Sequence, residues 1–473
     1  EDESDFNPED VRFSTVRYVA STTRNATGPS VSDPRNGEII ESDIRWFHNH
    51  IRSYRNRLLI ETGAANPDAR SLKLPEDLIG ETMRQVIAHE IGHALGLPHN
   101  MIASSAYPVD SLRNPDFARR MGVAPTIMDY ARQNYIAQPG DGLQNKDFIR
   151  QIGPYDHYAI EWGYRWYPDI NQPENEKKIL TNMILEHADD DMYRFGGRVS
   201  YNPESQTEDL GDDPVKASGY AVQNLQKVVP NLVTWTGRGG ESYEDLDEIY
   251  GELMFQWYRY MNHVTTVIGG VAENRKTYGQ AGPVYEPVAR ERQEEALEFL
   301  GNQVFETPQW LLHKEVLRRI EPAGAVERIR SFQERILSGI TTPPLLQRMV
   351  EAEALSPERA YPLDIYLNDL TEIIWAELEN SSPVIDIYRR NLQRAYIESM
   401  ASLMTEEFDI DAAQFFGTEV DVSQSDIRPA VRSKLQSLLS SITNKKGAIS
   451  DLRTQQHLED AIERIKKLLD RED

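Results

Sequence analysis

The sequence predicts an α+β domain, with a mixed twisted sheet and a helix that carries potential metal ligands, followed by an all-helical domain. Three observations predict this fold class. Residues 11–20 and 39–47 have the β-branched and aromatic composition of strands. From Asp77 onward, apolar side chains recur three and four positions apart, which is typical of a helix. Beyond residue 240, long amphipathic segments follow one another to the end of the chain.

The composition is that of a globular protein with an acidic surface. Of the 473 residues, 39% are hydrophobic and 27% are charged, and the net charge is −25. This length predicts two or three domains. An acidic surface repels phosphate, so we expect no nucleic-acid partner. The absence of cysteine excludes disulfides, thiol catalysis and cysteine-ligated metal sites. No apolar run approaches the ~20 residues that cross a bilayer, so no membrane span is expected.

We divide the chain into three parts. Residues 1–166 hold the predicted sheet and the helix with potential metal ligands. Residues 167–240 mix short helices with acidic loops, and we expect them to form an insert or a linker subdomain. Residues 241–473 are expected to be helical, apart from a hairpin at residues 268–287.

The expected elements follow one another along the chain in a simple order. The first part should contain a strand at 11–20, a turn at 33–38, a strand at 39–47, loops to about residue 76, a helix from Asp77, an irregular stretch at 101–153 and a helix at 154–166. The predicted helices of the third part cover residues 243–266, 288–303, 308–320, 323–338, 366–379, 383–404, 425–442 and 447–470.

The helix of the first part carries the segment HEIGHALGLPHN, which holds three of the ten histidines. His89 and His93 are four positions apart, so both imidazoles lie on one helix face and can reach one ion. His99 can supply a third nitrogen if the chain turns back at Gly96, because glycine adopts positive φ without penalty. A catalytic zinc needs protein ligands and one position for water. The spacing therefore predicts a zinc site with an open position.

Glu90 follows the first histidine of this segment. From this position its carboxylate can take a proton from the attacking water and pass it to the leaving amine. A solvated helix with chance histidines is the alternative interpretation. The further matches at Gly96 and His99 disfavour that alternative, so we expect a zinc-dependent hydrolase.

Residues 89–99 match the HExxHxxGxxH signature of the metzincin peptidases over its whole length. The segment TIMDY at residues 126–130 resembles the methionine turn of the same family. The resemblance implies that Met128 lies beneath the histidine ligands. It also implies that Tyr130 approaches the zinc and steadies the tetrahedral intermediate.

The helix at residues 154–166 resembles the one that follows the methionine turn in metzincins. The resemblance implies structural roles for Asp156 and Tyr164, and His157 is expected to be a packing or surface histidine. Asn100, after the third histidine, differs from the Asp or Ser of several metzincins. Substrate preference is therefore not predicted by the resemblance.

More narrowly, the chain resembles the Met-zincin domain proteins, which are large secreted bacterial proteins. The matching segments are DPRNGEIIESDIRW, the histidine helix, TIMDY, EDLGDDPVKASGY and FETPQWLL. The resemblance implies a zincin-like fold for residues 1–166, peptidase activity on a peptide or protein substrate, and a secreted, periplasmic or cell-envelope location. A metzincin core normally begins with a strand and a long backing helix. We therefore expect an upstream segment of the same gene product to complete the sheet and to cover its second, apolar face.

Three further expectations concern ligands and alternative functions. Calcium could bind through oxygen ligands at two acidic clusters, Asp189, Asp190 and Asp191, and Asp209, Asp212 and Asp213. Solvated loops are the simpler interpretation of these clusters.

Two alternatives to a zinc endopeptidase stay open. One is a non-enzymatic zinc-bound binding scaffold, and the other is a zinc amidase that acts on a cell-wall peptide. Glu90 disfavours the scaffold, because a scaffold needs no general base. We also expect strand 39–47 to edge the cleft and to pair with an extended substrate.

Overall fold

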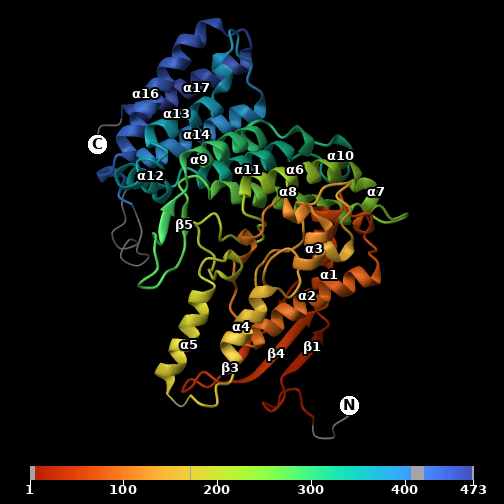
Figure 1. Ribbon diagram of the computed structural model, residues 1–473. Helices are drawn as coiled ribbons and strands as arrows, with labels where there is room; N and C mark the ends of the chain where they lie inside the picture. The colour runs from red at the N-terminus through yellow and green to blue at the C-terminus, as the bar shows by residue number, and fades with distance from the viewer. Residues whose placement is uncertain (1–5, 171, 406–419, 471–473) are drawn as a thin grey trace. The chain divides into compact units, whose positions relative to one another are not determined.

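The computed structural model describes residues 6–170, 172–405 and 420–470 (Figure 1). The chain forms two compact units. The first unit comprises Glu1–Ser200 and Glu204–Trp257, and the second comprises Tyr201–Pro203 and Tyr258–Asp473. The three-part division at residues 166 and 240 stays a prediction.

A small mixed sheet lies in the first unit. Its strands are β1 (Thr15–Val19), β2 (Ala26–Thr27), β3 (Ser30–Ser32) and β4 (Ile39–Phe47). β4 is central, because β1 pairs with it in parallel along one side and β2 and β3 pair with it antiparallel along the other. The strand expected at residues 39–47 is present. The prediction that it forms an edge is wrong, because it has partners on both sides.

One face of the sheet packs against α2 (Glu76–Ala94), the helix that carries the histidine segment. Trp46 of β4 and Ala26 of β2 are paired residues on this face, and both are buried against Val86 of α2. Successive side chains of a strand point to opposite faces, so the buried residues of β4 alternate with more exposed ones.

The other face of β1 and β4 carries charged and polar side chains. Arg17 of β1 forms an ion pair with Asp43 of β4, and the Thr15 hydroxyl donates to the same carboxylate at 2.6 Å. Arg45, on the same face, is exposed. Val16 and Tyr18 of β1, by contrast, are exposed apolar side chains. The expectation that an upstream segment completes the sheet and covers an apolar face stays a prediction.

A helix that the sequence did not predict lies between β4 and α2. α1 (His50–Arg57) continues directly into a π-helical turn at Leu58–Thr62. A loop was expected here because α1 is rich in polar residues, but several of these contact α8 (Glu244–Thr265). Arg52 forms an ion pair with Glu248 of α8, so the polar face of α1 is covered instead of solvated.

The remaining helices of the first unit are short. They are α3 (Pro115–Met121), α4 (Pro154–Tyr164), α5 (Pro173–Glu186), α6 (Pro214–Val228) and α7 (Leu232–Thr236). Four of them begin with proline, whose fixed φ suits the first helical position and whose missing N–H would be unpaired there. α4 occupies the place where the sequence predicted a helix after the methionine turn.

Long helices dominate the second unit. They are α9 (Arg290–Leu300), α10 (Lys314–Ile320), α11 (Ala325–Gly339), α12 (Pro343–Leu355), α13 (Leu363–Ile374), α14 (Ile387–Thr405), α16 (Ile427–Lys445) and α17 (Leu452–Leu469). All but α12 fall within or close to predicted segments. α14 packs against α11, α16 and α17 (Figure 1). It buries Leu392, Tyr396 and Met400 at helical spacing.

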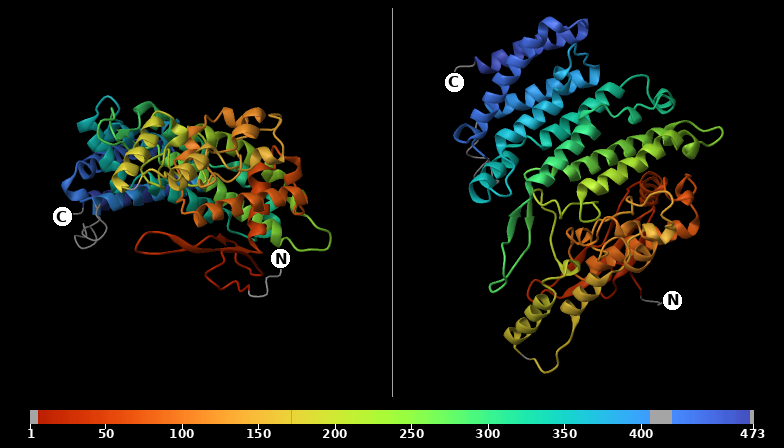
Figure 2. Two further views of the ribbon diagram at one scale, coloured as in Figure 1. Left: turned by 60° about the horizontal axis from the view of Figure 1, so that its bottom comes forward. Right: turned by 45° about the horizontal axis from the view of Figure 1, so that its top comes forward.

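The expected hairpin of the second unit is also present. β5 (Val271–Glu273) and β6 (Tyr285–Pro287) pair antiparallel, and the hairpin extends away from the helices of its unit (Figure 2). None of the described helices is long and apolar enough to cross a membrane.

Candidate metal centre

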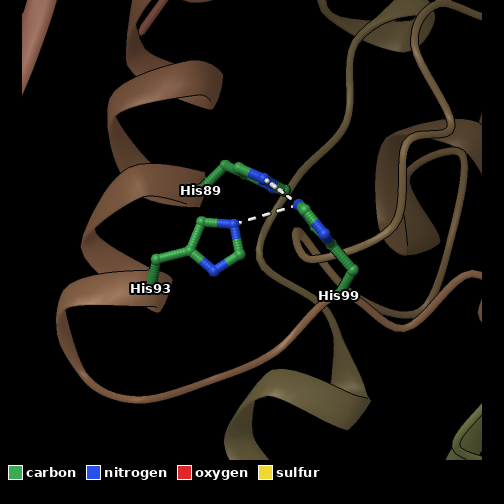
Figure 3. A group of neighbouring side chains, drawn as sticks. All are labelled: His89, His93 and His99. Carbon is green, nitrogen blue, oxygen red and sulfur yellow. Dashed lines mark hydrogen bonds between the residues drawn. The ribbon is translucent and has the colours of Figure 1, made fainter. Parts of the chain in front are cut away.

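Three histidine side chains converge at the C-terminal end of α2. His89 and His93 extend from neighbouring turns of the helix, and His99 faces them from the loop that follows (Figure 3). Nε2 of His99 lies 3.3 Å from Nε2 of His89 and 3.0 Å from Nε2 of His93. Tetrahedral ligands at about 2.0–2.1 Å from one zinc ion lie roughly 3.3 Å apart. The three nitrogens therefore have the spacing of a zinc site.

Gly96 makes the turn that brings His99 back to the helix. Its φ is +83°, a conformation that favours glycine. The Leu97 N–H donates to the Gly92 carbonyl at 2.9 Å, and the Gly96 N–H donates to the His93 carbonyl at 2.9 Å. These two hydrogen bonds form a Schellman motif, which ends the helix and reverses the chain.

Backbone carbonyls set the tautomers of the two helical histidines. Nδ1 of His89 donates to the Ile127 carbonyl at 2.7 Å, and Nδ1 of His93 donates to the Leu97 carbonyl at 2.9 Å. A carbonyl only accepts, so Nδ1 of each ring carries a proton, and in the tautomer with one ring proton the lone pair is at Nε2. Burial lowers the pKa of His89 to about 2 and the pKa of His99 to about 4. Lone pairs that converge from neutral imidazoles fit a cation between them.

Glu90, which directly follows His89 in α2, is buried. Burial raises its pKa to about 7, while the charges of Arg132 and Arg150 act in the opposite direction. Within the described part of the chain, no residue donates a hydrogen bond to the Glu90 carboxylate. Its oxygens are therefore free to accept a proton from water.

Gly28, in the turn between β2 and β3, packs directly against Glu90. A Cβ atom at Gly28 would lie 2.6 Å from the Glu90 carbonyl oxygen and 3.0 Å from Glu90 Oε2. Only glycine fits this close approach. The sheet edge beside Glu90 is thus formed by residues 26–32 and not by β4. The sequence contained one signal for this contact, the pair Gly28–Pro29 between two short strands.

Met128 lies against the turn of α2 between the two helical histidines. Its side chain is buried, and a Cβ atom at Gly92 would lie 2.2 Å from Met128 Sδ. The absence of a side chain at Gly92 allows this contact. Met128 therefore packs against α2 at Gly92, and its role as the methionine of a methionine turn stays a prediction.

Tyr130 stands beside the histidine group. The centroid of its ring lies 4.5 Å from that of His99 and 5.5 Å from that of His89. The guanidinium of Arg132 lies over the ring of Tyr130, 4.3 Å from the ring centroid. Tyr130 is therefore close enough to the group to take part in its chemistry.

Asp156, near the start of α4, holds the segment that contains Met128. Its carboxylate accepts hydrogen bonds from the Ile127 N–H at 2.9 Å, the Gly153 N–H at 2.8 Å and the Thr126 hydroxyl. At the other end of α4, the Tyr164 hydroxyl donates to the Leu95 carbonyl at 2.9 Å. α4 thus fixes both the methionine turn and the end of α2.

The comparisons with known proteins agree with this geometry. The model of a protein family described as Met-zincin matches residues 71–382, about two thirds of the chain. The chain belongs to the Met-zincin family. The match begins just before α2 and includes the histidines, the methionine turn and part of the second unit. It confirms the resemblance predicted from the motifs. No curated protein and no solved structure matches the chain at a significant level.

Two buried polar residues of this Met-zincin were not predicted to support the site. Asn100 donates from Nδ2 to the Arg194 carbonyl at 2.9 Å and accepts at Oδ1 from the Gly196 N–H at 3.0 Å. It therefore ties the chain after His99 to a loop that lies far along the sequence. Arg150 donates to the Ile127 carbonyl at 2.9 Å. In the sequence, only the glycine pair at residues 196–197 indicated the contact of Asn100 with this loop. No residue near Arg150 in the sequence indicated its contact with Ile127.

The expected calcium sites are not supported by the structure. Among the described residues, His89, His93 and His99 form the only group of three or more potential ligands placed to hold one ion. Asp190, Asp212 and Asp213 instead accept hydrogen bonds from backbone N–H groups. Asp213 caps α6, and Asp212 accepts a hydrogen bond from the Val109 N–H at 3.0 Å. Helix capping and hydrogen bonds to loop backbone account for these side chains.

His157 is exposed and does not belong to the group formed by His89, His93 and His99, as expected for a surface histidine.

Proposed function

We propose that this Met-zincin is a zinc-dependent endopeptidase, with His89, His93 and His99 as zinc ligands and Glu90 as general base. The observation that carries the proposal is the convergence of three imidazole nitrogens on a helix that also carries the buried carboxyl of Glu90, directly after the first histidine. Zinc bound there would polarise the scissile carbonyl and lower the pKa of a bound water to about 7. The family to which the chain belongs supports a zinc peptidase.

Glu90 moves the proton in the proposed reaction. Its carboxylate accepts a proton from water while the water oxygen forms a bond to the carbonyl carbon of the substrate. The carbon–nitrogen bond then breaks as Glu90 gives this proton to the leaving amine. Tyr130 is the proposed donor to the carbonyl oxygen as negative charge develops on it, because its ring lies beside His99.

The proposed substrate is an extended peptide that pairs with the sheet edge at residues 26–32. β2 and β3 pair with β4 on one side only, and the turn between them contacts Glu90 through Gly28. Pairing with an edge provides affinity through the backbone and makes little demand on sequence. We further propose a secreted, periplasmic or cell-envelope location, which rests on the resemblance to secreted Met-zincin proteins.

The decisive experiment is the Glu90→Gln variant of the full chain, assayed on a mixed peptide library with and without a chelator. Glutamine keeps the shape of the side chain and cannot act as a base. We expect the variant to keep one zinc per chain and kcat to fall about 10²–10⁴-fold. Glu81→Gln is the matched control on the same helix, where Glu81 pairs with the exposed Arg84. This control should retain wild-type kcat.

The same assay separates the alternative functions. Equal turnover by Glu90→Gln and wild-type protein would contradict the assignment of the base. Hydrolysis of a cell-wall peptide amide without cleavage of library peptides would indicate an amidase. Stoichiometric zinc without hydrolysis of either substrate would indicate a binding scaffold.

A further inference from the structure

Arg150 is buried behind the histidine group. Its side chain is only 1% exposed, and its backbone N–H donates to Gln85 Oε1 of α2 at 3.1 Å. Its Nη1 donates to the Ile127 carbonyl at 2.9 Å. The same carbonyl accepts the Nδ1–H of His89 at 2.7 Å. Arg150 and the first proposed ligand therefore share one acceptor.

The guanidinium of Arg150 forms no ion pair within the described parts of the chain, although its charge acts on the carboxyls of Glu90 and Asp129. Its Nε is buried and makes no hydrogen bond there. Burial lowers the pKa of Arg150, but an arginine side chain keeps its proton in proteins. A buried and unpaired cation lowers the stability of a fold. Packing therefore does not explain why an arginine occupies this position.

The shared Ile127 carbonyl couples Arg150 to His89, because both side chains donate a hydrogen bond to it. A carboxylate or a single carbonyl that accepts from a ligand histidine normally makes the imidazole more basic. Here the guanidinium draws on the same oxygen, so the oxygen attracts the His89 proton less strongly. The charge of Arg150 also has the same sign as a metal ion and acts through a medium of low dielectric constant. Both effects make Nε2 of His89 a weaker donor.

We propose that Arg150 is a positioning residue that orients His89 through the Ile127 carbonyl and, by its fixed charge, weakens metal binding while making the metal more electron-withdrawing. This inference rests on the proposed zinc site. A residue with only a structural role would act in the opposite direction, because loss of support for a ligand histidine lowers metal affinity about 10–100-fold. The sign of the change in zinc affinity therefore decides between the two roles.

The test compares zinc affinity in full-length variants, measured by competition with a chromophoric chelator. Arg150→Gln keeps a donor for the Ile127 carbonyl and removes the charge. We expect it to bind zinc about tenfold more tightly than the wild type, with a lower kcat. Arg150→Lys keeps the charge and should bind zinc with wild-type affinity. The ¹⁵N-coupled Nδ1–H signal of His89 should persist in both variants, because the acceptor is unchanged.

Arg132→Met provides the matched control. Arg132 also lies near the site, but its Nε pairs with Glu208 Oε1 at 3.1 Å, so its charge is compensated. Its charge acts on Glu90, but its hydrogen-bond acceptors, Glu208 and Tyr54, are not shared with a proposed ligand. We therefore expect a smaller change in zinc affinity for Arg132→Met than for Arg150→Gln. If Arg150→Gln does not fold, Arg150→Met replaces it in the same comparison.

The outcomes separate this inference from the proposed function. Weaker or equal zinc binding by the uncharged Arg150 variant would overturn the inference and leave the zinc site intact. Failure of the wild-type chain to bind zinc stoichiometrically would overturn the proposed function itself. Neither result depends on finding the substrate.

Discussion

Arg150 of the first unit and Arg389 of the second are both buried, but their surroundings differ. Arg389 forms an ion pair with Glu377, with Nη2 3.0 Å from Oε2. It also donates to the carbonyls of Phe305 and Ile374, each at 2.7 Å. Arg150 donates to one carbonyl and has no ion pair among the described residues. A buried charge with all its partners holds a fold together, whereas one that lacks them points to a role in function.

The largest effect on stability is expected for Arg389→Met. Methionine leaves the partly buried Glu377 carboxylate without its ion-pair partner, so that among the described residues Gln393 alone still donates to it. It also removes the arginine donor from the carbonyls of Phe305, Ile373 and Ile374. Loss of one member of a buried ion pair lowers the free energy of unfolding by about 3–5 kcal/mol. Zinc affinity should stay at the wild-type value, because this arginine belongs to the other unit. Urea denaturation and zinc competition test both statements. If Arg389→Met were as stable as the wild type and altered the zinc affinity, the proposed difference between a structural Arg389 and a functional Arg150 would be wrong.

The next largest effect is expected for Gly28→Ala, and it should fall on activity. The added Cβ would lie 2.6 Å from the Glu90 carbonyl, so the sheet edge must move away from the general base. A displacement of about 1 Å at a catalytic group can lower kcat/KM up to 10²-fold, and we expect a loss of roughly 10–100-fold. Gly163→Ala is the control, because no atom lies within 4 Å of its Cβ position. Equal kcat/KM for both variants would show that the edge at residue 28 does not position Glu90.

One buried residue of each unit, His457 in the second and Asp129 in the first, should contribute to the pH dependence of stability with opposite sign. In the second unit, burial lowers the pKa of His457 from its usual 6.5 to about 3, so the folded form resists protonation. Its contribution to stability is present above pH 6.5 and is lost as the pH falls toward 3, with a slope of roughly 1.4 kcal/mol per pH unit. In the first unit, burial raises the pKa of Asp129. The folded form keeps this proton, so stability is lost as the pH rises from the usual pKa of an aspartate to the raised one.

Denaturation midpoints of His457→Gln and Asp129→Asn between pH 4 and 8 test this difference. Each variant should lose the pH dependence contributed by its own residue, relative to the wild type. His457→Gln should flatten the acid side of the profile and Asp129→Asn the neutral side. Parallel profiles for wild type and either variant would contradict the corresponding assignment.

The contrast between the units also explains what the sequence could predict. α2 and the three histidines follow from spacings within a few residues, and the geometry of the histidine group agrees with those spacings. The amphipathic helices of the second unit were predictable for the same reason. α1 was missed because its arginines are paired by acidic residues almost 200 positions away, which hides its helical pattern.

Other features of the site depend on contacts between distant segments. β2 and β3 have two and three residues, too few to show a period of two, so the true sheet edge was not predicted. Asn100 and Arg150 acquire their surroundings only when the chain folds. Calcium at the acidic clusters is not supported, and composition alone does not distinguish carboxylates that cap a helix from carboxylates that bind an ion.

The smallest effect is expected for Gly80→Ala, which tests whether stability and activity are separable within α2 itself. Gly80 is exposed, and no atom lies within 4 Å of its Cβ position. Alanine in a helix interior restricts the unfolded chain and adds no clash, so the free energy of unfolding should rise by about 0.5–1 kcal/mol. Zinc affinity and kcat/KM should not change, because Gly80 lies more than two helical turns before Glu90. A change in kcat/KM as large as that of Gly28→Ala would mean that the whole helix, and not its contact with the sheet edge, limits the reaction.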